Sequence, residues 1–223
     1  MLTVHHLENS RSQRILWLLE ELGVSYDVKR YERDKESNLA PAELKAVHPL
    51  GKSPVIEDNG KVFAETGAMI EHILDAYGRG RLRPSAGTPA FDDYRYWLHA
   101  AEGTYMPPLV FTLFMNRIET APMPFFAKPI AKKIAQSIRE GYLNHTMKAQ
   151  YDFLEATLEN SPWLAGDDIT AADIIMSFPV EAFVARGGGE EGYPNIAAYL
   201  MRFQARPAYQ RALERGGPYA LMK

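Results

Sequence analysis

Glu65 and Thr66 stand directly before an apolar run with helical spacing, and their side chains suit a small charged ligand. Threonine is a common N-cap, so Thr66 is predicted to cap the helix that follows. The free N–H groups and dipole of a helix N-terminus favour a carboxylate, and the Glu65 carboxylate would attract an ammonium group. A ligand with both groups on one carbon is an amino acid or a γ-glutamyl group. An ordinary capped helix without a ligand explains the same pair.

The segment HPLGKSPVI, residues 48–56, is a second candidate binding element. Pro54 opens an apolar run that predicts a strand, at a position where proline withdraws no ladder hydrogen bond. A cis peptide bond before Pro54 would turn the chain sharply and expose the backbone of Ser53. Cis X–Pro bonds are uncommon in folded proteins, so this segment by itself favours a trans proline.

The composition restricts the chemistry that the chain can perform. Its 223 residues include no cysteine, so disulfide scaffolds, thiolate zinc sites and cysteine nucleophiles are excluded. Sulfur chemistry would therefore need a substrate that brings the sulfur. The net charge of -3 disfavours nucleic acid as a partner. The chain has no signal-peptide pattern and no apolar run long enough to span a bilayer, so we expect a cytoplasmic protein without a membrane partner. His5 and His6 point to opposite faces of a predicted strand, so we expect no metal site.

The elements that must position these residues begin with a strand–helix–strand unit. Residues 2–7 are predicted to form a strand, and residues 11–22 have apolar side chains on one helical face. Gly23 stands where a C-cap glycine would end this helix. Alternation over residues 26–28 predicts a second strand, parallel to the first through a right-handed crossover.

A hairpin and a helix follow this unit. Residues 54–56 begin a strand, residues 58–60 (DNG) predict a tight turn, and residues 62–64 form the return strand. Residues 69–77 then have helical spacing. The order βαβ then ββα is that of the thioredoxin-like fold, which we predict for residues 1–77.

After residues 78–87, which carry glycine and proline without periodicity and predict a linker, the strand signals end. Residues 88–223 are therefore predicted to form an all-helical domain. Its first helix begins with Thr88 as N-cap, and Pro107 and Pro108 are expected to end or kink it. Further helices are expected within 130–158, over 171–185 and 194–205, and near the end of the chain.

Two segments together resemble the cytosolic glutathione S-transferase family, in its serine-type bacterial and fungal branch. They are LENSRSQRILWLLEEL, residues 7–22, and HPLGKSPVIEDNGKVFAETGAMIEHIL, residues 48–74. Members have a Pro-led hairpin followed by Glu/Gln-Ser/Thr at the next helix, and the first helix resembles their pattern H-S/N-S-R-x-x-R-x-L-W-L-L. The resemblance implies a glutathione-binding thioredoxin-like domain, an all-helical domain, and glutathione as co-substrate.

The resemblance places the thiolate-stabilising group in the first loop. Serine-type members have a Ser four residues before an Arg, and Ser10 and Arg14 have this spacing. Ser10 is therefore the implied catalytic residue, with Asn9, Arg11 and Ser12 as other candidates. A role for Ser10 as a helix cap stays open, because capping and donation to a thiolate use the same geometry.

The same resemblance assigns residues to the other parts of glutathione. It implies that the backbone of Ser53, next to a cis Pro54, pairs with the cysteinyl part. It implies that Glu65 and Thr66 hold the γ-glutamyl end and that Lys52 faces the glycyl carboxylate. Lys52 as a solvated surface residue is the alternative.

Two parts of the site have weaker signals. Members often have a His that helps to bind the glycyl carboxylate, but Leu39 stands roughly there, so this contact would depend on the lysine or on a neighbour such as Asn38. The apolar pocket for the second substrate has Tyr105, Met106 and Phe111 as candidates. A place in the hydrophobic core is the alternative for these three.

Three functions fit these residues. The leading hypothesis is a glutathione S-transferase that activates the glutathione thiolate for attack on small hydrophobic electrophiles. The same site would also serve a glutathione-dependent peroxidase or disulfide reductase. A non-catalytic binding module is the third possibility, and the presence of Ser10, Glu65 and Thr66 argues against it. The resemblance also implies a homodimer, packed through the helix after Thr66 and the long helix after the linker.

Overall fold

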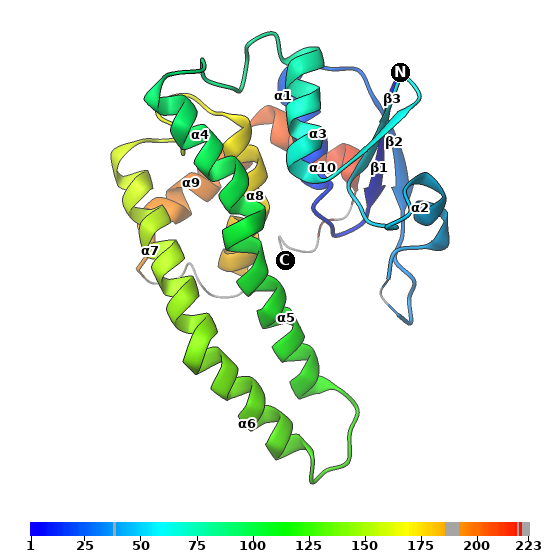
Figure 1. The fold of residues 1–223 in the computed structure, drawn as a ribbon, viewed down its shortest axis with the longest axis vertical. Coiled ribbons are helices and arrows are strands. Elements are labelled where there is room, and N and C mark those ends of the chain that lie inside the picture. The colour runs from blue at the N-terminus through cyan, green and yellow to red at the C-terminus, as the bar shows by residue number, and fades with distance from the viewer. Residues whose placement is uncertain (38, 186–191, 218, 220–223) are drawn as a thin grey trace.

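The computed structural model describes residues 1–37, 39–185, 192–217 and 219. A small mixed sheet with its helices lies beside a larger group of helices, and one pair of helices projects from this body as an arm (Figure 1). The order of elements confirms the predicted fold class, a thioredoxin-like N-terminal domain followed by a helical domain.

The sheet has four strands in the order β2-β1-β3-β4. β1 (Leu2–Leu7) pairs in parallel with β2 (Asp27–Tyr31) and antiparallel with β3 (Val55–Asp58). β4 (Lys61–Ala64) pairs antiparallel with β3. Asn59 and Gly60 in the connecting turn have φ values of 50° and 79°, as a tight hairpin turn requires. Both the βαβ unit and the hairpin are thus confirmed.

α1 (Gln13–Leu22) is the helix that leads out of the first loop. Its apolar face is buried, and Gly23 ends it in the left-handed conformation with φ 63°, as predicted for a C-cap glycine. The helix begins at Gln13 rather than at residue 11. α3 (Thr66–Ile73) follows the hairpin directly and packs against α1.

A short helix that the sequence did not predict, α2 (Ala42–Val47), lies between β2 and β3. Its one buried side chain, Leu44, packs against Leu7 and Tyr31. A helix of this length with a single buried residue has no periodicity to detect, which explains why it was missed.

The helical domain begins with one long path of three segments. Thr88 caps α4 (Pro89–Ala100), and its hydroxyl accepts a hydrogen bond from the N–H of Phe91 at 3.3 Å. A π-helical turn, η2 (Ala101–Tyr105), then leads into α5. Pro107 and Pro108 stand in the first turn of α5, where proline is tolerated. The predicted end or kink of the helix is therefore observed as a π-helical turn that directly precedes the two prolines. The remaining elements are α5 (Met106–Thr120), α6 (Lys128–Ile138), the π-helical turn η3 (Arg139–Leu143), α7 (Asn144–Asn160), α8 (Ala171–Phe183), α9 (Pro194–Gln204) and α10 (Pro207–Gly216).

The two domains pack through α1. This helix contacts α8 and, near the end of the chain, α10. The Trp17 ring lies 5.5 Å from the Phe203 ring and 5.2 Å from the Tyr209 ring. The helix that follows the candidate catalytic loop is therefore held by both domains.

The spacing of Thr170 and Asp173 predicts a capping box at the start of α8, and the structure has one. Asp173 is fully buried and accepts hydrogen bonds from the Thr170 N–H at 2.8 Å and from the Leu164 N–H at 2.9 Å. The Tyr199 hydroxyl donates to it at 3.0 Å. This one carboxyl therefore links the start of α8 to α9 and to the preceding loop.

Glu181, later in α8, is a buried carboxyl that accepts hydrogen bonds from the hydroxyls of Tyr209 and Tyr219. Burial raises the pKa of Glu181 to about 7, although both hydroxyls act to lower it. At a pH between 4.5 and about 7, Glu181 is therefore protonated in the folded state and ionised in the unfolded state, where its pKa is the ordinary 4.5.

We expect Glu181→Gln to remove a pH dependence of stability. The contribution of protonated Glu181 to the free energy of unfolding is fully present below the unfolded pKa of 4.5, and it is lost as the pH rises through about 7. Between about pH 5 and about pH 7 the wild type should lose about 2 kcal/mol relative to the variant. Urea unfolding at several pH values measures this, with the exposed Asp168→Asn as the control. Parallel pH profiles for the wild type and Glu181→Gln would contradict the assignment.

No helix in the described part of the chain is both long and apolar enough to cross a membrane.

Candidate active site

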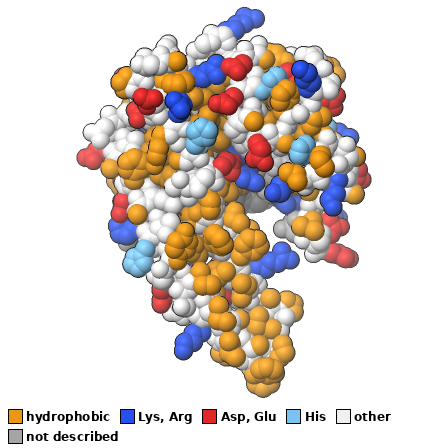
Figure 2. Space-filling model, in the orientation of Figure 1, with side chains coloured by type: hydrophobic (Ala, Val, Ile, Leu, Met, Phe, Trp, Pro, Cys, Tyr) orange, Lys and Arg blue, Asp and Glu red, His pale blue; other side chains and the backbone are white. Residues whose placement is uncertain are grey.

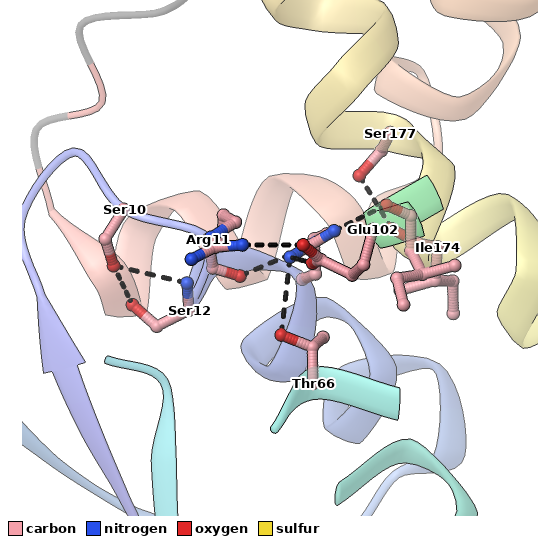
Figure 3. Close-up of polar contacts among 9 residues, drawn as sticks. Ser10, Arg11, Ser12, Thr66, Glu102, Ile174 and Ser177 are labelled. Atoms are coloured by element: carbon pink, nitrogen blue, oxygen red, sulfur yellow. Dashed lines mark hydrogen bonds and ion pairs between the residues drawn. The ribbon is translucent and has the colours of Figure 1, made fainter. Parts of the chain in front are cut away.

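Ser10 lies in the connection between β1 and α1, close to the N-terminal end of that helix (Figure 3). Its side chain is buried, with 6% exposed. Ser10 Oγ accepts a hydrogen bond from the Ser12 N–H at 3.2 Å and lies 2.7 Å from Ser12 Oγ. The N-cap residue of α1 is Ser12, so Ser10 is not the cap that the sequence left as its alternative role.

A neutral histidine stands behind these two hydroxyls. Ser12 Oγ lies 2.8 Å from His6 Nδ1. Burial, together with the charge of Arg30, lowers the pKa of His6 to about 4, so its ring is uncharged near neutral pH. The two hydrogen bonds can run in either direction. When His6 Nδ1 donates to Ser12 Oγ and Ser12 Oγ donates to Ser10 Oγ, the Ser10 hydroxyl is able to donate its proton to a ligand atom. When Ser10 Oγ donates to Ser12 Oγ, the Ser10 proton is used within the protein.

The other two candidates in the first loop have different surroundings. Asn9 is exposed and has a φ of 48°. Arg11 is partly exposed, and its Nη1 donates to Glu102 Oε2 at 2.6 Å. Of the four candidates in this loop, Ser10 and Ser12 are thus the hydroxyl donors at the helix N-terminus.

The peptide bond between Ser53 and Pro54 is cis, as the resemblance implies. The Ser53 side chain is bound to β1, because its Oγ donates to the His5 carbonyl at 2.9 Å and accepts from the Leu7 N–H at 3.1 Å. A ligand at Ser53 would therefore meet its backbone rather than its hydroxyl.

The helix α3 begins one residue earlier than predicted from Glu65 and Thr66. Glu65 is the N-cap residue and Thr66 is the first helical residue, so the prediction that Thr66 is the N-cap is wrong. Thr66 is buried, and its hydroxyl accepts a hydrogen bond from Arg14 at 3.4 Å instead of capping the helix. Glu65 is exposed and has a φ of 69°. Positive φ is uncommon for residues other than glycine and often occurs at ligand sites.

Arg14 joins three elements from the centre of the protein. It is 1% exposed, and it donates to Thr66 of α3, to Glu102 of η2 and to the Ile175 carbonyl of α8, the last at 2.8 Å. In a regular helix the Ile175 carbonyl would accept the N–H of residue 179, but that residue is Pro179, which has no N–H. The Arg14 guanidinium therefore replaces a helix hydrogen bond that the proline removes.

Glu102 is the site residue that sequence reasoning missed. It lies in a π-helical turn between α4 and α5, and both Arg11 and Arg14 donate to its carboxylate (Figure 3). Burial alone would raise the pKa of Glu102, but the two guanidinium groups outweigh it and the pKa is lowered. Glu102 is therefore a carboxylate that compensates the buried Arg14. The available signal was an arginine on the buried face of α1, which requires a partner.

The residues expected near the glycyl carboxylate are at the surface. Lys52 is exposed, and no ion pair joins it to the described carboxylates. Leu39 is 66% exposed. Asn38 lies outside the described residues.

The structure separates the three candidates for the second-substrate pocket. Tyr105 is 1% exposed in the main core, where its hydroxyl donates to the Gln150 carbonyl at 2.8 Å. Met106 is 7% exposed and packs with Leu109 and Ala182. Both thus take the core alternative, because Tyr105 packs against α7 and Met106 packs against α8. Phe111 is 49% exposed and is the one of the three that a ligand can reach.

The arrangement provides donors for an anion at two helix N-termini. Ser10 and Ser12 lie at the start of α1, Glu65 and Thr66 lie at the start of α3, and Arg14 connects the two helices. A hydroxyl and a helix N-terminus together stabilise a thiolate. Among the described residues, no group of three or more His, Asp or Glu side chains is placed to hold a metal ion.

Comparisons with known proteins agree with this geometry. The family models for the N-terminal and C-terminal domains of glutathione S-transferase match residues 1–75 and 114–207. Glutathione S-transferase 1 of Saccharomyces cerevisiae is 33% identical over 223 residues, covering 96% of this chain and 95% of the relative. Glutathione S-transferase 3 of Schizosaccharomyces pombe is 32% identical, with coverages of 96% and 88%. A crystal structure of a glutathione S-transferase from Actinobacillus pleuropneumoniae has a TM-score of 0.82 and 35% identity, and covers 100% of this chain and 96% of its own. The chain belongs to the glutathione S-transferase family.

Proposed function

We propose that this protein is a glutathione S-transferase in which Ser10 stabilises the glutathione thiolate for attack on small hydrophobic electrophiles. The observation that carries the proposal is the connection of the two helix N-termini. Ser10 and Ser12 lie at the start of α1, and Thr66 lies at the start of α3 (Figure 3). The Arg14 side chain of α1 donates a hydrogen bond to the Thr66 hydroxyl and so joins the two helix starts. One tripeptide can therefore place its thiol at the first and its γ-glutamyl group at the second.

Thiolate formation is the step that needs the protein. A free thiol has a pKa of about 8.5, and each unit of lowering requires about 1.4 kcal/mol of preference for the anion. The Ser10 hydroxyl and the N-terminal N–H groups of α1 supply this preference together. The thiol proton leaves to solvent, the sulfur forms a bond to the electrophilic carbon, and the leaving group departs with its electron pair.

The remaining contacts hold glutathione in place. The Glu65 carboxylate faces the γ-glutamyl ammonium, and the start of α3 at Thr66 accepts the γ-glutamyl carboxylate. The Ser53 backbone pairs with the cysteinyl part, since the Ser53 side chain is used by β1. Lys52 supplies the positive charge for the glycyl carboxylate. Phe111 is the exposed apolar residue that we assign to the electrophile side.

We expect Glu65→Ala to weaken glutathione binding at least about tenfold, because a hydrogen bond to a charged group contributes about 1.5–3 kcal/mol. Titration calorimetry with glutathione measures the dissociation constant of the wild type and the variant. Glu57→Ala removes an exposed carboxylate from the neighbouring strand β3 and is the matched control, which should bind like the wild type.

Three outcomes of this titration differ in meaning. Lost binding in Glu65→Ala alone supports the γ-glutamyl site. Equal binding in both variants would move that site elsewhere. A wild type that does not bind millimolar-range glutathione would refute the enzyme proposal. With a binding wild type, rates on a chlorinated nitrobenzene and on cumene hydroperoxide separate the transferase from the peroxidase.

Assembly, location and domain limits are further proposals. We infer a homodimer packed through α3 and α4, and a cytoplasmic location. We assign residues 1–77 to the thioredoxin-like domain, residues 78–87 to the linker and residues 88–223 to the helical domain. The exposed Tyr96 side chain on α4, 48% exposed, supports a partner surface on that helix.

A further inference from the structure

The arm formed by α5, α6 and their connection has an exposed apolar surface that the glutathione site does not use. We call it the apolar arm surface, and it consists of Ile118, Phe125, Phe126, Ile130, Ile134 and Ile138. Phe125 is 84% exposed, Phe126 65% and Ile130 61%. Apolar side chains cover most of this face of the arm (Figure 2). Contiguous exposed apolar surface on a soluble protein marks an interaction site.

The arm is held together without these residues. Its inner side contains the small cluster Met115, Ala135 and Leu143. Outside this cluster, Arg139 forms an ion pair with Glu119 at 2.7 Å. The two helices are thus packed by their own contacts, and the apolar arm surface is left for a partner.

α6 has the side-chain distribution of a helix that lies at a membrane surface. Ile130, Ile134 and Ile138 are spaced by four residues and share one face. Lys128, Lys132 and Lys133 are exposed, and in the described chain no carboxylate forms an ion pair with them. Apolar residues on one face with lysines beside them are typical of interfacial helices.

The charge of the arm favours an anionic surface. Residues 106–143 contain five basic residues and two acidic ones, a formal charge of +3, whereas the whole chain has -3. The rest of the protein therefore carries -6. An anionic bilayer attracts the arm and repels the body, which orients the protein with the arm toward the lipid.

The position of the arm separates it from the proposed dimer contacts. Phe125 and Phe126 lie in the connection between α5 and α6, at the far end of the long axis from α3 and α4 (Figure 1). Two adjacent phenylalanines at a projecting tip fit insertion among lipid headgroups.

We propose that the apolar arm surface binds reversibly to the surface of anionic phospholipid bilayers. The sequence predicted no membrane partner because only a spanning segment was sought. An interfacial helix needs no such length, and the proposal is compatible with the lack of a spanning helix in the described residues.

Sedimentation with vesicles tests the proposal on the full chain. We expect binding to vesicles of phosphatidylcholine with phosphatidylglycerol, weaker binding to pure phosphatidylcholine, and weaker binding at high salt. The double variant Phe125→Ser/Phe126→Ser should bind the mixed vesicles at least about tenfold more weakly. Met201→Ser, which removes a side chain 66% exposed on α9, is the matched control and should bind normally.

A charge variant and the oligomeric state complete the test. Lys128→Gln/Lys132→Gln/Lys133→Gln should lose the preference for anionic vesicles, whereas Lys35→Gln/Lys45→Gln/Lys61→Gln, with the same charge change, should keep it. Light scattering after gel filtration should give the same mass for the wild type and the double phenylalanine variant. A wild type that binds neither vesicle, or a phenylalanine variant that changes the oligomeric state, would overturn the proposal, the latter in favour of a second copy on the arm.

Discussion

Replacing Ser10 by Ala should lower kcat/KM for glutathione conjugation about 100-fold and leave the affinity for glutathione nearly unchanged. The lost hydroxyl is a donor to the charge that develops on sulfur, and one such donor contributes about 2.7–4 kcal/mol in a site closed to water. The pKa of bound glutathione should rise toward that of the free thiol. Ultraviolet absorbance of the thiolate as a function of pH measures this pKa directly.

Variants of the neighbouring hydroxyl and of Ser10 itself are the controls. Ser10→Thr keeps a hydroxyl and should recover part of the activity. Ser12→Ala removes the hydroxyl that lies between Ser10 and His6, and we expect a smaller loss because the Ser12 N–H still donates to Ser10. If the pKa of bound glutathione stayed at its wild-type value in Ser10→Ala and rose in Ser12→Ala, the thiolate donor would be Ser12 instead.

Asp173→Ala should destabilise the folded protein by about 4 kcal/mol, although it lies outside the active site. The variant removes the side-chain acceptor of the Leu164 and Thr170 N–H groups and of the Tyr199 hydroxyl, all of which stay buried. Each buried donor without a partner costs about 1–3 kcal/mol, and the loss of the Thr170 N–H bond also removes the Asp173 half of the capping box. Urea unfolding at neutral pH measures the change in the free energy of unfolding.

The size of this effect distinguishes a buried network from an ordinary surface cap. Asp168→Ala, an exposed aspartate in the same loop, should change stability by less than about 0.5 kcal/mol. Asp173→Asn keeps an acceptor oxygen and should fall between the two. If Asp173→Ala lowered the free energy of unfolding by less than about 1 kcal/mol, the three donors that bind Asp173 would have to find water as an equivalent partner in the variant.

The sequence predicted the helix ends and turns whose backbone conformation depends on particular residue types. The left-handed Gly23, the DNG turn at residues 58–60 and the Thr88 cap each require particular residue types, so each was visible in the sequence. The cis bond before Pro54 was not, because the segment alone favours trans; it followed only from the resemblance to a family.

The tertiary parts of the site were beyond local patterns. Glu102 lies 88 residues after Arg14 in the chain, and nothing in the sequence selects it among the acidic residues. The N-cap residue of α3 is Glu65 rather than Thr66, and the Thr66 hydroxyl binds a guanidinium from another helix, a contact that the local sequence does not show. Tyr105 is in the core because of helices that pack over it, which periodicity in one helix does not reveal.

The hydrogen bond from Arg14 to the Ile175 carbonyl has a consequence for how the chain unfolds. If the domains separated, the Ile175 carbonyl opposite Pro179 would lose its protein donor, and the Arg14 guanidinium would lose both Ile175 and Glu102. Each domain therefore has a polar group whose hydrogen-bond partner lies in the other domain. The two domains should melt in one cooperative transition, and neither should form a stable unit when expressed alone.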